Sequence, residues 1–212
     1  MRDETERSLV AVLVDGFPGG TAGRLFLRED RKTDAMDNSL QIRIARVDEL
    51  AALNALMELA IAELLKPFLN AAEIASSRAI MGLDTQLVRD GTYFVVEENG
   101  TLAGCGGWSR RATMYGGDVS PGRDPALLDP AKDAARVRAM YTHPSFIRRG
   151  VGRLILAQCE EAARAEGFTR AELVATMAGL PLYLACGYQP VERFTDDRGG
   201  APVPLARMVK AL

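Results

Sequence analysis

The chain has 212 residues, of which 48% are hydrophobic and 25% are charged, and its formal net charge is -2 at pH 7. These values are typical of one globular domain with a sizeable core. A pI of about 5.6 without a stripe of aromatic and basic residues argues against a nucleic acid partner. The chain has no run of 18 apolar residues, so we expect no membrane partner.

The N-terminal sequence MRDETER carries acidic residues and lacks the apolar core and cleavage site of a secretory signal, which predicts a cytoplasmic location. The cysteines Cys105, Cys159 and Cys186 are odd in number and have no paired spacing, so neither a disulfide framework nor a metal site is expected. The only histidine, His143, precedes a proline and is typical of a turn. We therefore expect no metal cofactor.

Residues 1–38 match no clear structural element, and we interpret them as an N-terminal extension, peripheral or flexible, before a domain over residues 39–212. Alternation predicts a strand over residues 41–46. Asp48 is then expected to cap an amphipathic helix that runs to about Leu65 and ends before Pro67. A second helix is predicted from Asn70 to about Met81.

Residues 92–98 and 101–109 read as the two strands of a hairpin, because Asn99-Gly100 is a preferred two-residue turn. A loop rich in Gly, Asp and Pro follows over residues 110–134, and its length is too great for a passive connector. The remaining pattern predicts, in order, a strand at 137–142, a helix at 151–166, a strand at 170–176, a short helix closed by Gly187, a strand from Tyr188, and an edge-like strand at 203–209.

The sequence VRAMYTHPSFIRRGVG, residues 137–152, places glycines at the junction between a buried strand and a helix. Unpaired backbone N–H groups and the positive end of the helix dipole meet at such a junction. Three arginines, Arg148, Arg149 and Arg153, add positive charge around it. This combination predicts a phosphate cradle.

Spacing distinguishes between types of cradle. Gly150 and Gly152 are too close together for a Walker loop, and Ile155 stands where a dinucleotide fingerprint needs its third glycine. The glycines at 104–107 have no helix pattern directly after them. The tract from Met140 to Gly152 resembles instead the pyrophosphate loop of the GNAT superfamily of acyl-CoA-dependent N-acetyltransferases, except that Ile147 replaces the usual Arg or Gln.

The sequence from Gly179 to Tyr188 carries a second resemblance to GNAT proteins. Tyr183 lies four residues before the Gly187-Tyr188 pair, as the tyrosine of that family does. The order of predicted elements from Leu40 to Leu212 is also the usual GNAT order. The resemblance therefore implies an α/β (α+β) fold, with a central mixed, mostly antiparallel sheet that splays beside residues 137–142.

The resemblance also implies a function and a set of site residues. The function is transfer of an acetyl group from acetyl-CoA to a primary amine by direct attack in a ternary complex, with Tyr183 as general acid or hydrogen-bond donor to the sulfur. The acceptor is expected to be a small molecule, and a homodimer is compatible with the sequence. The residues expected to bind acetyl-CoA are Met140, Tyr141, Thr142, Arg148, Arg149, Gly150, Val151, Gly152 and Arg153.

The sequence offers several candidates for the general base and for the acceptor site. Glu97, Glu98, Asp118 and an ordered water are all candidates for the base. Trp108 is interpreted either as a pocket wall or as a core residue. Arg110 and Arg111, with Tyr115, are candidates for binding an anionic group on the acceptor. Two other functions stay open, a non-catalytic acyl-CoA-binding or sensing module and an acetyltransferase for protein or peptide amines.

Overall fold

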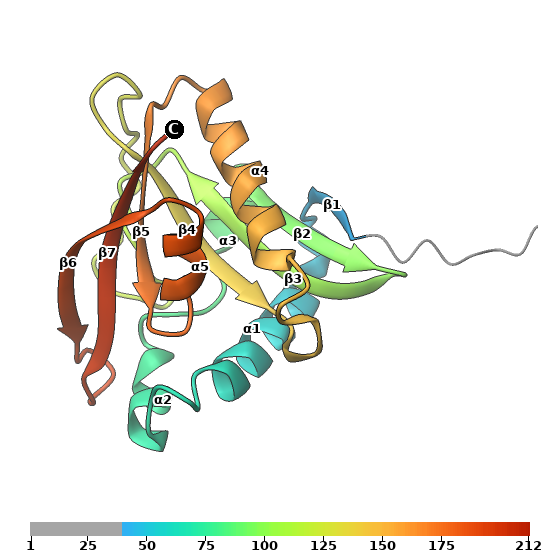
Figure 1. Ribbon diagram of the computed structural model, residues 1–212, viewed down its shortest axis with the longest axis vertical. Coiled ribbons are helices and arrows are strands. Elements are labelled where there is room, and N and C mark those ends of the chain that lie inside the picture. The colour runs from blue at the N-terminus through green and yellow to red at the C-terminus, as the bar shows by residue number, and fades with distance from the viewer. Residues whose placement is uncertain (1–39) are drawn as a thin grey trace, which may run out of the picture. The chain divides into compact units, whose positions relative to one another are not determined.

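The computed structural model describes residues 40–212, and the predicted extension at residues 1–38 lies outside the described residues. Seven strands form one sheet in the order β1-β2-β3-β4-β5-β7-β6 (Figure 1). Within this sheet only the β4–β5 pair is parallel. The strands are β1 (Gln41–Ile44), β2 (Tyr93–Glu98), β3 (Thr101–Ser109), β4 (Ala135–Thr142), β5 (Arg170–Thr176), β6 (Gln189–Asp196) and β7 (Val203–Ala211). The predicted mixed, mostly antiparallel sheet is confirmed.

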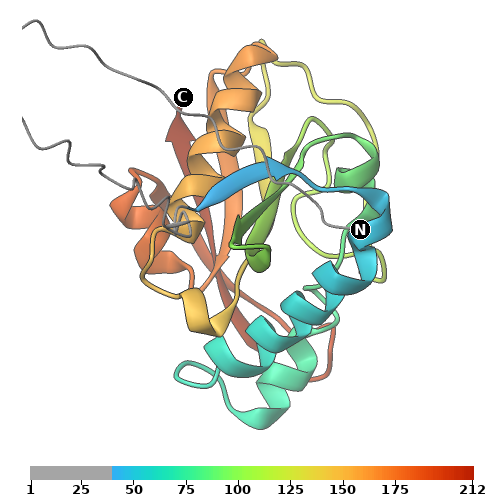
Figure 2. The same cartoon turned by 90° about the vertical axis from the view of Figure 1, so that its right-hand side faces the viewer.

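Helices cover both faces of the sheet, with α4 and α5 on one face and α1 and α3 on the other (Figures 1 and 2). The central strands β2 and β3 are therefore buried along most of their length, as strands covered on two sides must be. The helices are α1 (Leu50–Leu64), α2 (Ala71–Ser77), α3 (Thr85–Arg89), α4 (Val151–Ala165) and α5 (Leu180–Ala185), with short 3-10 turns at Val47–Glu49 and Pro144–Phe146. Over residues 40–212, no helix has the length and apolar character needed to cross a membrane.

The predicted hairpin between β2 and β3 is confirmed. Asn99 and Gly100 both have positive φ angles, of 51° and 74°. Positive values at both central residues match the twist that two antiparallel strands require of a two-residue turn. The turn therefore sets the pairing of β2 with β3.

Two predictions about the first helices were wrong in detail. Asp48 does not cap α1, because it lies within the 3-10 turn and its side chain is exposed. The second helix begins next to Asn70, as predicted, and the Asn70 side chain caps it by accepting from the N–H groups of Ala72 and Glu73, but the helix ends at Ser77 and not near Met81. A separate short helix, α3, was not predicted. It begins after Asp84, whose carboxylate accepts from the N–H of Gln86.

The last strand is not an edge strand, contrary to the prediction. β7 lies between β5 and β6, and its residues on both faces are buried or half-buried except for Ala211 at its end. β6 forms the edge and is largely exposed, with Pro190 at a position where an edge strand tolerates a missing N–H. The composition of β7, which alternates little between apolar and polar residues, is the signal that both of its faces are covered.

The loop at residues 110–134 is held by hydrogen bonds within itself and to the end of β6. Thr113 and Asp124 exchange backbone and side-chain hydrogen bonds across its base. The Tyr115 hydroxyl donates to Asp196 over 2.8 Å, and Arg198 donates to the Pro121 carbonyl over 3.0 Å. These contacts hold the loop, including Tyr115, against the C-terminal end of β6.

Candidate active site

The strands β4 and β5 separate in the middle of the sheet. Their pairing is confined to Ala135 with Ala171 and Arg136 with Glu172. Beyond that point β5 continues to pair with β7, whereas β4 diverges from it (Figure 1). The predicted splay beside residues 137–142 is confirmed. The edge of β4 that faces β5 is therefore free to pair with an extended ligand.

A β-bulge lies in β4 beside this opening. The register with β3 moves from Cys105–Tyr141 to Gly107–Arg138, so that Ala139 and Met140 face the single residue Gly106. Ala139 has a φ of 51°, a conformation that costs a non-glycine residue on the order of 1 kcal/mol. The Tyr93 hydroxyl donates to the Ala139 carbonyl over 2.7 Å and holds the bulge in place.

The glycines at 104–107 are explained by this bulge and by the packing of α4. A Cβ atom at position 106 would lie 2.5 Å from the Met140 sulfur, and one at position 104 would lie 2.4 Å from a Val151 methyl group. The tract is therefore a close-packing surface under the site rather than a second phosphate loop. Its glycines allow the bulge and α4 to approach β3.

The N-terminus of α4 opens toward the splayed strands. Gly150 is its N-cap residue, with a φ of 89° and no side-chain cap. Within residues 40–212, the N–H groups of Val151, Gly152 and Arg153 donate to no protein oxygen. Since α4 has 15 residues, these groups also carry the positive end of a helix dipole. The arrangement suits a phosphate group.

The lack of a side chain at Gly152 allows α5 to pack closely against the first turn of α4. A Cβ atom there would lie 2.8 Å from a terminal methyl of Leu182 on α5 and 3.9 Å from the Thr142 hydroxyl oxygen. Gly152 thus lies where α4, α5 and β4 converge. A side chain at this position would meet Leu182 in the first turn of α4, which also carries the free N–H groups.

The three arginines of the predicted cradle differ in placement. Arg148 and Arg153 line the cavity described below. Arg149 does not. Its guanidinium pairs with Glu98 at the end of β2 and lies 5.0 Å from the Phe146 ring centroid. Arg149 therefore ties the turn before α4 to the β2–β3 hairpin, and its predicted side-chain role toward phosphate gains no support from this placement.

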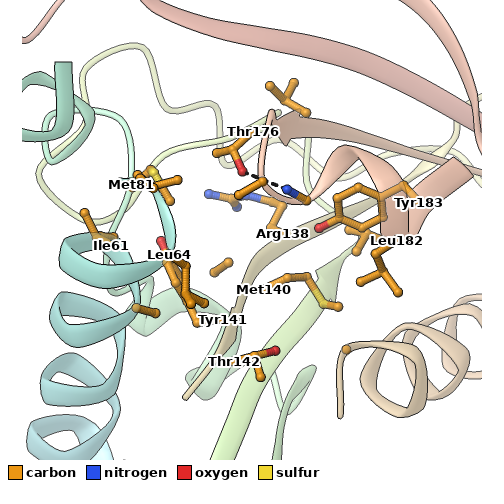
Figure 3. Close-up of a pocket in the computed structure, with 18 of the residues that line it drawn as sticks. Ile61, Leu64, Met81, Arg138, Met140, Tyr141, Thr142, Thr176, Leu182 and Tyr183 are labelled. Atoms are coloured by element: carbon orange, nitrogen blue, oxygen red, sulfur yellow. Dashed lines mark hydrogen bonds between the residues drawn. The ribbon is translucent and has the colours of Figure 1, made fainter. Parts of the chain in front are cut away.

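A cavity of about 610 Å³ joins the α4 N-terminus, the splayed strands and the inner face of α1. With the exception of Arg149, every residue predicted to contact acetyl-CoA lines it, and so does Tyr183. Figure 3 shows the Tyr183 hydroxyl directed toward the interior, across from Met140. Burial raises the pKa of Tyr183, so the hydroxyl keeps its proton and is a donor rather than a base.

The half of the cavity away from α4 is mostly apolar. It has one charged residue among those the structure describes, Arg138, whose side chain is 3% exposed. Burial lowers the pKa of the Arg138 guanidinium, while the nearby Asp84 acts in the opposite direction. The apolar residues here include Ile61, Leu64, Met81, Met114, Val174 and Leu205.

The three carboxylates proposed as bases do not line the cavity. Glu97 pairs with Arg43, Glu98 pairs with Arg149, and Asp118 accepts from the N–H of Thr85. Indeed, none of the cavity-lining residues in the described part of the chain is Asp, Glu or His. Sequence reasoning placed these acids near the site, but their partners direct them elsewhere.

The residues proposed to recognise the acceptor are also placed differently. Trp108 is a core residue, 1% exposed, and packs edge-on against Phe168. Arg110 pairs with Glu166 and Arg111 with Asp90, both outside the cavity. Of that group only Tyr115 lines the cavity. Sequence reasoning did not select Arg138, although two arginines, Arg136 and Arg138, within a largely apolar strand were an available signal.

Comparison with solved structures shows which known proteins share this fold. A GCN5-related N-acetyltransferase from Rhodopseudomonas palustris matches with a TM-score of 0.60 and 18% identity, over 81% of this chain and 95% of that chain. YncA from Salmonella typhimurium, solved with its cofactor acetyl-CoA, matches with a TM-score of 0.56 and 18% identity, over 82% and 95% of the two chains.

PaiA N-acetyltransferase from Thermoplasma acidophilum, solved in complex with coenzyme A, has a TM-score of 0.54 and 13% identity, over 82% of this chain and 99% of that chain. Identities this low establish a similarity of fold. No curated protein matches the chain. The model of the acetyltransferase (GNAT) family, however, matches residues 53–188. Since this match covers more than half of the sequence and agrees with both motifs, the chain belongs to the acetyltransferase (GNAT) family.

Proposed function

We propose that the protein transfers the acetyl group of acetyl-CoA to a primary amine of a small molecule, by direct attack in a ternary complex. The observation that carries this proposal is a single cavity that joins a phosphate cradle, a splayed strand, a buried tyrosine hydroxyl and an apolar wall. Its volume of about 610 Å³ is in the usual range for small-molecule sites.

The residues present fit coenzyme A. The free N–H groups of Val151, Gly152 and Arg153 would bind the pyrophosphate, with Arg148 and Arg153 as additional cations. The unpaired edge of β4 around Met140, Tyr141 and Thr142 would pair with the amides of the pantetheine arm. Bound acetyl-CoA supplies the thioester carbonyl and the thiolate leaving group.

Two groups of the protein would stabilise the transition state. The backbone N–H at the Met140 bulge would donate to the developing oxyanion, an interaction commonly worth about 3–4 kcal/mol. Tyr183 would donate its proton, or a hydrogen bond, to the leaving sulfur. The raised pKa keeps the Tyr183 hydroxyl protonated, so that it can donate a hydrogen bond to the sulfur as negative charge develops there.

Direct attack is supported by the composition of the cavity wall. No cysteine of residues 40–212 lines the cavity, and burial raises the pKa of the Cys105 thiol to about 12. An acyl-enzyme on a cysteine therefore has no nucleophile in reach. The amine would reach the thioester in its neutral form and pass its proton to water.

This account predicts an unusual pH profile. Because the cavity wall described here has no carboxylate or imidazole, and Tyr183 stays protonated, kcat/KM should follow ionisation of the acceptor alone. It should rise about tenfold per pH unit until the acceptor amine is neutral and then level off. Two acceptors whose amines differ in pKa should give inflections separated by that difference. An inflection at one fixed pH for both acceptors would indicate an enzyme base.

The absence of a carboxylate from the described cavity wall also favours a second candidate, a protein that binds acyl-CoA without turnover. Thiol release from acetyl-CoA, measured with a panel of small amines and with peptides that have free N-termini, separates these functions. Amine-dependent release with small molecules supports the proposed enzyme. Release with peptides alone assigns a peptide substrate. Tight coenzyme A binding without release under any condition indicates a binding module.

A further inference from the structure

The acceptor half of the cavity contains an arginine whose hydrogen bonds are incomplete. Arg138 extends from β4 into the cavity and is drawn between Met81 and Thr176 in Figure 3. Its Nη2 donates to the Gly116 carbonyl over 2.8 Å and lies 2.6 Å from the Asp84 carboxylate. Its Nε is buried without a partner, and the hydrogen bonds recorded for residues 40–212 include none from Nη1.

The charge around Arg138 is also incompletely balanced. Asp84 is fully buried and is shared with Arg123, whose Nη2 lies 2.8 Å from its other oxygen. Two guanidinium groups therefore share one carboxylate. Asp118 lies nearby, but it is exposed and its oxygens accept from the N–H of Thr85. A buried cation with unmade hydrogen bonds is costly, and a carboxylate that reaches it supplies both the charge and the acceptors.

We propose that Arg138 binds a carboxylate on the acceptor, so that the substrate class is an apolar amino acid with a free carboxylate. This inference rests on the proposed acetyltransferase function and names its acceptor. The apolar residues around Arg138 would contact the side chain of such a substrate. Because Arg138 precedes Met140 by two residues on β4, an amine adjacent to the bound carboxylate is held near the bulge.

The wild-type protein gives a first test that needs no variant. We expect kcat/KM for leucine, methionine and phenylalanine to exceed that for the corresponding amides by about tenfold or more. The amides keep the amine and the apolar side chain but lack the charge. Their amines are also less basic and more often neutral, so chemistry alone favours them. Equal rates, or faster rates with the amides, would overturn the assignment.

Variants then test whether Arg138 is the source of the preference. R138Q should raise KM for leucine at least tenfold and reduce the ratio of acid to amide to near one. R138K keeps the charge and should retain part of the ratio. R123Q is the matched control, since it also removes one ion pair of Asp84, but Arg123 does not line the cavity. It should keep the wild-type ratio. If R123Q lost the ratio equally, disturbance of Asp84 would explain both variants, and direct contact between Arg138 and the carboxylate would be overturned.

Calorimetry separates this inference from the proposed function. Leucine and leucinamide are titrated into protein saturated with coenzyme A, and no turnover is needed. Leucine binding that is weakened at least tenfold in R138Q but not in R123Q supports the inference, even if no amine is acetylated. If amines are acetylated but leucine and leucinamide bind equally, the inference fails and the acetyltransferase stands. Should R138Q not fold, the wild-type comparison and R138K decide.

Discussion

Replacing Gly152 with aspartate is expected to weaken coenzyme A binding by at least about 100-fold, or about 2.7 kcal/mol. The new carboxylate would add a negative charge to the first turn of α4, which carries the free N–H groups expected to bind the pyrophosphate. Two unit charges about 4 Å apart repel by about 4 kcal/mol at an effective dielectric of 20. The fold should survive, because an acidic residue in the first turn of a helix is stabilising and Leu182 can move its terminal methyl group.

Calorimetric titration with coenzyme A, together with thermal unfolding, measures both effects. Gly152→Ala is the control for size alone and should lose much less affinity than Gly152→Asp. Arg149→Ala is the control for charge near the turn. Since Arg149 pairs with Glu98, Arg149→Ala should change the affinity for coenzyme A only a few-fold, and the size of this change should depend little on salt concentration. Gly150→Asp is a less clean test, because its φ of 89° adds backbone strain. Wild-type affinity for coenzyme A in a folded Gly152→Asp protein would show that the pyrophosphate does not bind at the N-terminus of α4.

Tyr183→Phe is expected to lower kcat at least about tenfold, or about 1.4 kcal/mol, with almost no change in affinity for coenzyme A. The substitution removes one hydroxyl, which is needed mainly when negative charge develops on the sulfur. The ring would keep its edge-on contact with Tyr188, whose centroid is 5.9 Å away. Steady-state kinetics with a fixed amine and calorimetry with coenzyme A give the two quantities.

Tyr188→Phe provides the matched control. Tyr188 is buried beside Tyr183 but does not line the cavity, so its substitution should leave kcat unchanged. A loss of thermal stability in Tyr183→Phe without a change in kcat would make Tyr183 a core residue. A rise in KM for acetyl-CoA with unchanged kcat would make it a coenzyme contact instead.

The parts of the fold and site that local sequence determines were predictable. The Asn99-Gly100 turn, the Gly150 cap of α4 and the position of Tyr183 depend on φ angles or spacing within a few residues. The splay of β4 from β5 was expected only because the motifs resemble those of a family. Those features place the half of the cavity that we propose for the coenzyme.

The parts that depend on distant partners were not predictable. Arg149 and Arg153 are both close to Gly150 in sequence, but only Arg149 meets Glu98 and turns away from the cavity. The insertion of β7 between β5 and β6 is a matter of long-range pairing. Arg138 gained its importance from Asp84 and Gly116, which lie far from it in the chain. The half of the cavity that we propose for the acceptor is built from such contacts.

A crystal structure of the protein with coenzyme A tests the central claim most directly. The account predicts the pyrophosphate within hydrogen-bonding distance of the N–H groups of Val151 and Gly152. It also predicts the pantetheine arm along the free edge of β4 and the sulfur beside the Tyr183 hydroxyl. Coenzyme A bound outside this cavity, or bound within it with its sulfur away from both Tyr183 and Met140, would contradict the account.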